Sequence, residues 1–177
     1  PDGVSRHRTG GDGGAPGVER DRYRWRAVRL WRITLRKYAL DKSCAGAAHY
    51  GGRWNPVGMP ALYCGTSIAI TALEKFVHIA STRLPLVLVA VDIPDETSIY
   101  EPDPTTLPAG WDALPTSASA QAFGGAWLAS NANLALKIPS AILPEEANVM
   151  VNPRHPDYPA VKLTVVRPFT FDPRMGK

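Results

Sequence analysis

The sequence predicts an α+β fold, with short mixed or antiparallel sheets and a few helices. Strand-like segments lie on both sides of two or three helical segments, and they do not follow the regular βαβ alternation of a doubly wound sheet. Seventeen prolines keep the elements short. A chain of 177 residues is long enough for one domain with a sizeable core.

Residues 1–27 differ in composition from the rest of the chain. They contain six glycines before position 18, few apolar side chains, and six arginines against four carboxylates. Such a segment cannot bury enough surface to offset its chain entropy, and it lacks the apolar stretch of a signal peptide. We therefore expect a flexible basic arm over 1–27, either an upstream extension or an expression remnant, and one domain over 28–177.

The first predicted strand lies around Trp31, Ile33 and Leu35, which alternate with polar residues in the period-2 pattern of a strand with one buried face. This strand would carry Arg32 on its other side. After a Gly/Ala-rich loop, residues 61–64 are a candidate for a second, short strand.

A helix is predicted next, from a cap at Thr66 or Ser67 to about Ala80. Apolar residues occupy most of its circumference, so we expect it to be well buried. The valine-rich run Leu86–Ile93 is continuous and apolar, which is typical of a central strand buried on both faces.

The second half of the chain predicts one helix and several short strands. A proline-rich connection over 94–115 precedes a helix-like stretch over 117–132, which Gly124 and Gly125 weaken. Strand candidates then lie at 135–138, 148–151, 161–166 and 169–171.

Composition excludes several classes of function. No apolar run approaches the roughly 20 residues that span a bilayer, so a membrane role has no support. The net charge of +4 is spread thinly outside the arm, so we expect no direct nucleic-acid binding. Cys44 and Cys64 have neither zinc-ligand spacing nor the number for a disulfide framework, so we expect two buried thiols in a cytoplasmic protein.

Glu74 is the most informative single residue. It lies mid-helix among apolar neighbours, where a carboxylate is costly to bury unless something uses it. His78 follows one turn later on the same side. A surface glutamate beside an exposed histidine is the alternative, and helix geometry alone leaves it open. A metal site is disfavoured because Glu-x-x-x-His supplies too few ligands.

The run Gly51-Gly52-Arg53-Trp54-Asn55-Pro56 is the second unusual stretch. Its two glycines let the backbone approach a ligand closely, and Arg53 presents a planar donor fork suited to a pyrophosphate. The run is neither a Walker loop nor a Rossmann turn. A structural turn with Arg53 packed on Trp54 is the alternative.

These stretches, with several others, resemble the RES domain family, which is named for its arginine, glutamate and serine. The resemblance runs from about Arg29 to Met175. It rests on the number, order and spacing of its motifs, which are Gly51–Pro56, Pro60–Tyr63, Ala72–Glu74 with Val77–His78, Ile138–Ser140, Asn148, Val151–Tyr158 and Phe171–Arg174.

The resemblance implies the toxin of a bacterial type II toxin–antitoxin pair of the RES–Xre or ParT–ParS kind, with an ADP-ribosyltransferase-like fold and NAD⁺ as co-substrate. It also implies a cognate antitoxin with an Xre-like helix-turn-helix that occludes the active site. By position, the family's catalytic residues fall on Glu74, Arg53, Tyr63 and Ser140. The expected cofactor-binding residues are Arg32, Arg53, Tyr63, His78 and Ser140, and no metal is expected.

In this interpretation Glu74 stabilises the oxocarbenium-like state of nicotinamide–ribose cleavage, and it bonds ribose hydroxyls or acts as a general base. Arg53 and Arg32 would hold the pyrophosphate. Tyr63 would pack on nicotinamide or ribose, and Ser140 would contact the cofactor. Without the resemblance, Tyr63 is most simply a strand core residue and Ser140 a loop residue.

Three functions stay open. We favour mono-ADP-ribosyl transfer to a host protein, such as the nucleotide-biosynthesis enzyme phosphoribosyl pyrophosphate synthetase, because His78 beside Glu74 resembles the family members that modify proteins. An NAD⁺ glycohydrolase or phosphorylase, with water or phosphate as acceptor, is the second. The third is a non-enzymatic binding module in which Arg53 and Glu74 form a structural pair.

Overall fold

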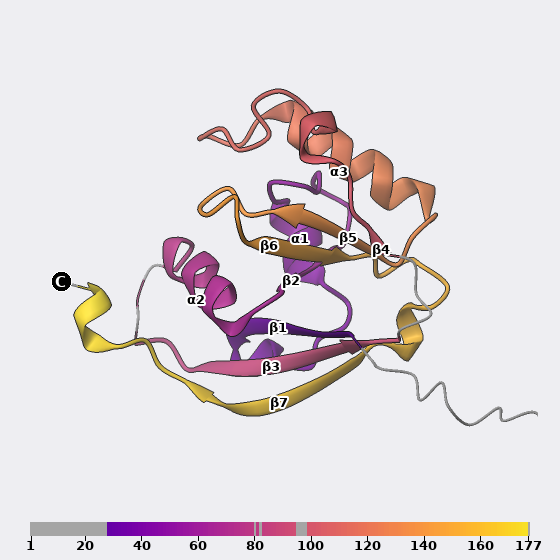
Figure 1. Cartoon of the computed structure of the whole chain (residues 1–177). Helices are drawn as coiled ribbons and strands as arrows, with labels where there is room; N and C mark the ends of the chain where they lie inside the picture. The colour runs from indigo at the N-terminus through magenta and orange to yellow at the C-terminus, as the bar shows by residue number, and fades with distance from the viewer. Residues whose placement is uncertain (1–27, 80, 82, 95–98, 177) are drawn as a thin grey trace, which may run out of the picture.

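The computed structural model describes residues 28–79, 81, 83–94 and 99–176 (Figure 1). The arm predicted over 1–27 lies outside the described residues. In chain order the elements are β1 (Val28–Leu35), α1 (Ala45–Tyr50), β2 (Leu62–Gly65), α2 (Ile68–Val77), β3 (Leu86–Ile93), β4 (Ile99–Tyr100), α3 (Ala118–Ser130), β5 (Ala135–Pro139), β6 (Ala147–Val151) and β7 (Lys162–Phe169).

The strands form one sheet in the order β4-β5-β6-β2-β1-β3-β7. Every neighbouring pair is antiparallel except β4 and β5, which are parallel. The predicted α+β class is therefore confirmed. β1 pairs with β3 over its whole length, but it meets β2 at a single register position, Trp31 opposite Gly65. The sheet consequently divides into two halves, β4-β5-β6-β2 and β1-β3-β7, seen above and below each other in Figure 1.

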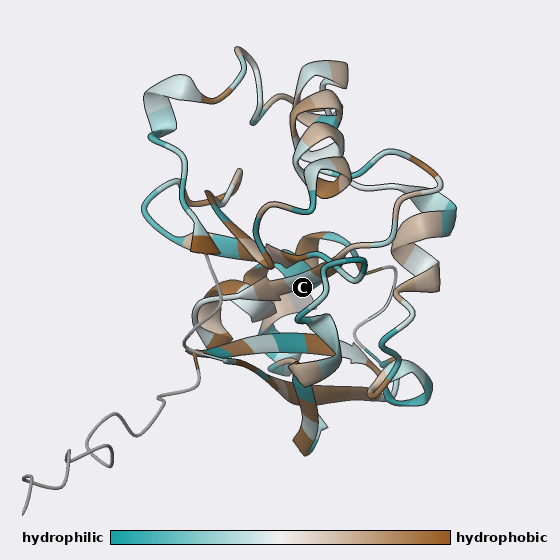
Figure 2. Cartoon of the chain, turned by 90° about the vertical axis from the view of Figure 1, so that its right-hand side faces the viewer, coloured by the Kyte–Doolittle hydropathy of each residue, from teal (hydrophilic) through white to brown (hydrophobic). Residues whose placement is uncertain are grey.

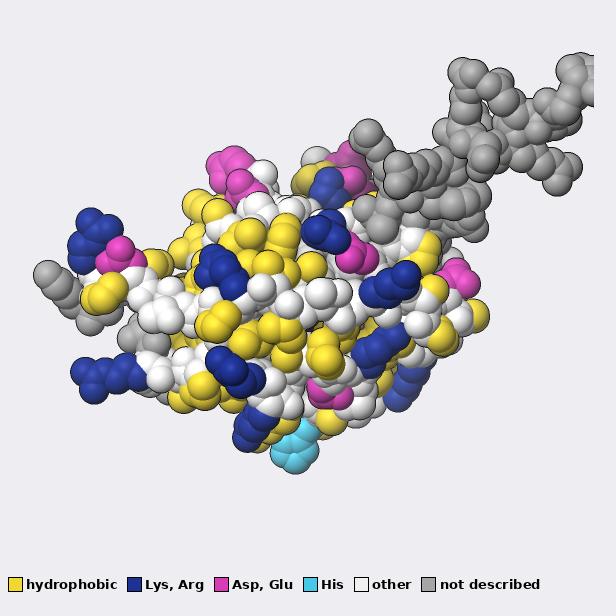
Figure 3. Space-filling model, turned by 90° about the horizontal axis from the view of Figure 1, so that it is seen from below, with side chains coloured by type: hydrophobic (Ala, Val, Ile, Leu, Met, Phe, Trp, Pro, Cys, Tyr) yellow, Lys and Arg dark blue, Asp and Glu magenta, His cyan; other side chains and the backbone are white. Residues whose placement is uncertain are grey.

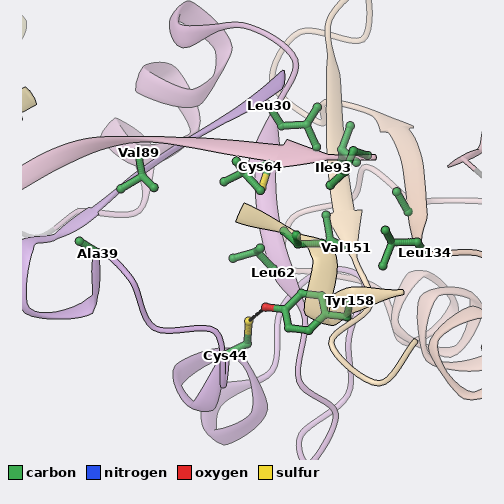
Figure 4. Packing of buried hydrophobic residues seen from close by; sticks show 14 of the residues in the cluster. Leu30, Ala39, Cys44, Leu62, Cys64, Val89, Ile93, Leu134, Val151 and Tyr158 are labelled. Atoms are coloured by element: carbon green, nitrogen blue, oxygen red, sulfur yellow. Dashed lines mark hydrogen bonds between the residues drawn. The ribbon is translucent and has the colours of Figure 1, made fainter. Parts of the chain in front are cut away.

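The largest hydrophobic cluster joins the two halves. It combines Leu62 and Val151 from one half with Leu30 and Val89 from the other, and Tyr158 closes one side (Figure 4). Figure 2 shows that the most hydrophobic segments lie mainly in the strands. The prediction that Leu86–Ile93 is a strand buried on both faces is also confirmed, because every residue of β3 except Asp92 is buried.

Two smaller clusters hold the helices on the sheet. In one, Trp127 and Leu128 of α3 pack with Leu136 and Met150 of the strands. In the other, α2 and Phe171 pack with Ile33 and its neighbours on β1 and β3; Figure 1 shows α2 and α3 in separate positions around the sheet. Helix α3 thus packs on the β4-β5-β6-β2 half of the sheet, and α2 packs on the β1-β3-β7 half.

The predicted helix after Ser67 is shorter and more exposed than expected. Ser67 caps it by accepting a hydrogen bond from the Ile70 N–H, but α2 ends at Val77, where the His78 N–H turns back to earlier carbonyls. Its buried residues are Ile70 and Thr71, while Val77 is exposed. Because α2 lies beside the junction of the two half-sheets, one side of it stays open to solvent.

Three local predictions were wrong. The Gly/Ala-rich loop contains α1, since alanine is the best helix former and Gly51, with a φ of 70°, ends the helix. In place of separate strands over 161–166 and 169–171 there is one strand, β7, which ends at Phe169 and has a register shift at Val166, opposite Leu88/Val89. The proline-rich connection contains β4, which extends the sheet beside β5.

β7 is the free edge of the lower half-sheet. Val165 and Val166 are exposed on it, and in the view from below, Figure 3 shows apolar side chains interspersed with Lys and Arg on this face. Within the described part of the chain, no helix is long and apolar enough to cross a membrane.

Candidate functional site

Glu74 is held by two hydrogen bonds to the same carboxylate oxygen. Its Oε1 accepts from the Ser140 hydroxyl at 2.7 Å and from the Asn148 side-chain amide at 2.6 Å. The Glu74 side chain nevertheless keeps 24% of its surface exposed. The carboxylate is therefore anchored at one oxygen and still reachable from solvent. A simple surface glutamate would lack this anchoring.

Gly65 lets α2 bring Glu74 to this position. A Cβ on Gly65 would overlap the hydroxyl of Thr71 and lie 2.9 Å from a methyl of Ile70, so only glycine allows α2 to approach β2 this closely. Gly65 stands opposite Asn148 in the β2–β6 register. The helix residue one turn beyond Ile70, Glu74, consequently meets Asn148 on the sheet.

Ser140 is completely buried at the end of β5, in the connection to β6. Its backbone N–H donates to Glu146 across that connection. Its hydroxyl oxygen accepts the N–H groups of Ile142, at 3.0 Å, and Leu143, at 3.3 Å, while donating to Glu74. The predicted loop serine is thus a fully bonded structural element of the Glu74 environment.

His78 lies at the C-terminal end of α2, with its Nε2 3.9 Å from Glu74 Oε2. Its side chain is 76% exposed. His78 and Glu74 therefore share the same open side of the helix, as the i, i+4 spacing predicted, and the histidine approaches the carboxylate oxygen that Ser140 and Asn148 do not occupy.

Tyr63 belongs to a second network, built from the Gly51–Pro56 segment. Its hydroxyl donates to Asn55 Oδ1 at 2.7 Å and accepts the Trp54 N–H at 3.2 Å, and burial raises the pKa of Tyr63. Gly52 has no room for a side chain, because a Cβ there would lie 2.7 Å from Asn55 Oδ1 and 3.0 Å from the Tyr63 hydroxyl.

Asn55 connects this network to the backbone of neighbouring segments. It is fully buried, and its amide donates to the carbonyls of Ala47 and Met59 at 2.9 and 2.8 Å. Tyr63 pairs with Met150 and Gly65 with Asn148, so Tyr63 and Asn148 share one face of adjacent strands, two positions apart in register. The second network therefore lies next to the Glu74 cluster.

Arg53 fixes the segment around Trp111. Its Nη1 donates to the carbonyls of Trp111, at 2.8 Å, and Ala113, at 2.9 Å. Trp54 stacks on Trp111, with ring centroids 5.9 Å apart. No ion pair joins Arg53 to Glu74 in the part of the chain that the structure describes.

Arg32 lies apart from the other predicted site residues. Its neighbour Trp31 pairs with Gly65, and Gly65 pairs with Asn148, so these three positions share one face of the sheet. Because side chains alternate along a strand, Arg32 lies on the other face. Its Nη1 is buried without a hydrogen-bond partner among the described residues. Burial lowers the pKa of Lys75 on α2, and the Arg32 charge lowers it further.

The structure thus brings Glu74, Ser140 and His78 into one cluster and links Tyr63 to it through the sheet register. The residue that sequence reasoning missed is Asn148, which appeared among the family motifs without a role. A polar amide in an otherwise apolar strand was the available signal, but its target on α2 is 74 residues away in the sequence.

The cysteines are buried and free, as predicted. Cys44 Sγ lies 3.6 Å from the Tyr158 hydroxyl, a contact drawn as a dashed line in Figure 4. Burial raises the pKa of Cys64 to about 12. Among the described residues no group of three or more His, Cys, Asp and Glu side chains is arranged to hold a metal ion.

A family model described as the RES domain matches residues 29–172. The chain is 44% identical, over 82% of its length and 95% of the relative's, to a Sphingobium protein named "Prs ADP-ribosylating toxin". It is 38% identical, over 84% of its length and 99% of the relative's, to "Toxin Res" of Yersinia enterocolitica. The toxin–antitoxin complex MbcT–MbcA of M. tuberculosis contains a chain of similar fold, with a TM-score of 0.62, 17% identity and coverage of 85% of this chain and 87% of that one. The family match over most of the chain and these two identities show that the protein belongs to the RES domain family.

Proposed function

We propose that this chain is the toxin of a bacterial toxin–antitoxin pair and that it cleaves NAD⁺, transferring the ADP-ribose to a protein side chain. The observation that carries the proposal is the Glu74 carboxylate, anchored at one oxygen and open at the other, in a RES domain protein. The 44% identity to a relative named as an ADP-ribosylating toxin supports transfer as the reaction.

The reaction breaks the bond between C1′ of the ribose and the ring nitrogen of nicotinamide, which leaves with the bonding electrons as neutral nicotinamide. Positive charge then develops on C1′ and the ribose ring oxygen, and a nearby carboxylate stabilises it. The acceptor attacks C1′ and loses a proton, for which Glu74 is the proposed base. One carboxylate thus serves both the bond that breaks and the bond that forms.

Arg53 is the proposed pyrophosphate ligand. Arg53 uses Nη1 on two carbonyls, and a guanidinium has five N–H donors, so Nε and Nη2 keep three for a phosphate. Arg32 lies on the other face of the sheet from Asn148, so it is not proposed as a ligand of the same pyrophosphate. Tyr63 is proposed to pack on nicotinamide or ribose with its ring, while its hydroxyl stays on Asn55.

A cognate antitoxin with an Xre-like helix-turn-helix is the proposed partner, and it would cover the open side of Glu74 and His78. The fold shared with a chain of a toxin–antitoxin complex supports this proposal. An unrestrained NAD⁺-consuming enzyme would kill the cell that produces it. Phosphoribosyl pyrophosphate synthetase, a nucleotide-biosynthesis enzyme, is the proposed acceptor.

The test incubates the purified chain with host lysate and NAD⁺ labelled in its adenylate portion. We expect one discrete labelled protein and released nicotinamide, and neither with Glu74→Gln. Glu145→Gln is the matched control, because Glu145 is an exposed glutamate in the connection that carries Ser140.

Two results would change the assignment. Rapid loss of NAD⁺ with an unlabelled lysate, and with ADP-ribose or its 1-phosphate found by mass spectrometry, would make the chain a glycohydrolase or phosphorylase. A Glu74→Gln variant as toxic to cells as the parent would support the binding module instead.

A further inference from the structure

We propose that Asn148 is a positioning residue for Glu74, that Ser140 shares this role, and that Oε2 is the carboxylate oxygen that works on the substrate. This inference rests on the proposed function. It starts from the two donors that converge on Oε1, at 2.6 Å from Asn148 and 2.7 Å from Ser140.

Every hydrogen-bonding position of the Ser140 hydroxyl is occupied within the protein. A serine hydroxyl offers one proton and two lone pairs. The proton goes to Glu74, and the two lone pairs accept the backbone N–H groups of Ile142 and Leu143. Ser140 is also completely buried. It therefore acts through Glu74 and neither attacks C1′ nor contacts the nucleotide.

Asn148 complements Ser140 from the opposite strand. Ser140 directly follows β5 and Asn148 lies on β6, with Ile138 opposite Asn148 in the register, so the hairpin presents both donors to the same point. A carboxylate oxygen that accepts two short hydrogen bonds is fixed in direction. The hairpin, and not the rotamer preference of Glu74 on α2, then sets the direction of the carboxylate.

The remaining oxygen faces the open side. His78 Nε2 lies 3.9 Å from Oε2, beyond hydrogen-bond distance. In this proposal a hydroxyl or amine donates to Oε2 beside the exposed His78 ring. The ribose hydroxyl or the acceptor group is accordingly placed between Glu74 and His78.

The test measures NAD⁺ turnover by the full chain carrying Asn148→Ala or Asn148→Asp. We expect kcat to fall about 10- to 100-fold, because a small misplacement of a reacting group costs that much, while KM changes less than about twofold. Asn148→Asp keeps the shape but loses the donor, so it should fall at least as far. A normal kcat in Asn148→Asp would overturn the proposal. Glu145→Gln is again the control, and unchanged melting temperatures exclude loss of folding.

A double-mutant comparison separates positioning from a general structural role. If Asn148 acts only through Glu74, then adding Asn148→Ala to Glu74→Gln lowers the residual rate by less than about twofold. Full additivity of the two losses would overturn the proposal.

Toxicity to cells gives a readout that does not depend on NAD⁺ chemistry. A wild-type chain that kills cells but leaves NAD⁺ intact would refute the proposed function. The positioning role would still stand if Asn148→Ala and Ser140→Ala lose toxicity together with Glu74→Gln, and it would fall if they stay as toxic as wild type.

Discussion

Replacing Gly124 with alanine tests whether α3 must touch the backbone of the Gly51–Pro56 segment. A Cβ at Gly124 would lie 2.7 Å from the carbonyl carbon of Trp54 and 2.9 Å from its Cα, and it would overlap the carbonyl oxygen. Backbone atoms cannot rotate away as a side chain can. Either α3 or the segment that carries Arg53 must therefore move.

The expected cost follows from two opposing terms. Overpacking a core costs about 1–3 kcal/mol, and a clash with backbone belongs at the upper end of that range. Alanine in place of a helical glycine returns about 1 kcal/mol. We expect a net loss of about 2 kcal/mol in the free energy of unfolding, which lowers the melting temperature by about 4–8 °C in a domain of this size.

Gly46→Ala is the matched control, because it makes the same substitution within α1, where an added Cβ meets no atom within 4 Å. Its stability should stay unchanged or rise by up to about 1 kcal/mol. Thermal unfolding followed by circular dichroism measures both variants. A Gly124→Ala protein that melts at or above the wild-type temperature would refute the close contact between α3 and Trp54.

Two further predictions concern buried polar groups. Tyr63→Phe removes a donor to Asn55 and an acceptor for the Trp54 N–H, so urea unfolding should show a loss of about 1–3 kcal/mol; wild-type stability would contradict the network. Because burial raises the pKa of Cys64 from 9.0 to about 12, the folded state keeps a proton that the unfolded state loses, and stability should fall as pH rises from about 9 towards 12. At pH 8 a thiol reagent should label Cys64 only at the rate of unfolding, and immediate labelling of the native protein would disprove its burial.

Much of the secondary structure could be predicted because it depends on local patterns. The alternation around Ile33 predicted a strand correctly, but its one buried face was wrong, because Leu30 and Thr34 on the other face are buried too. The continuous apolar run of β3 is buried on both faces as predicted, and Ser67 caps α2 by a hydrogen bond within one turn. Local patterns placed the end of α2 too late and divided β7 into two strands. Both features depend on contacts with neighbouring strands and loops.

The two adjacent glycines of α3 illustrate the limit of local reasoning. By propensity, Gly124 and Gly125 weaken a helix, yet α3 runs through both. Added side chains there would meet the backbone of Trp54 and the ring of Pro56. The glycines permit helix α3 to approach a segment some 70 residues earlier in the chain, and no local pattern carries that information.

The sequence by itself determined the family, the identities of the candidate residues and the positions of most strands, since these follow from residue types and their spacing. Only the tertiary structure decided how the candidates are used. It directs the Ser140 hydroxyl and the Asn148 amide to one oxygen of Glu74, and it buries Nη1 of Arg32 without a hydrogen-bond partner among the described residues. The physical reason is that a hydrogen bond depends on separations of about 3 Å, which the packing of distant strands and helices sets.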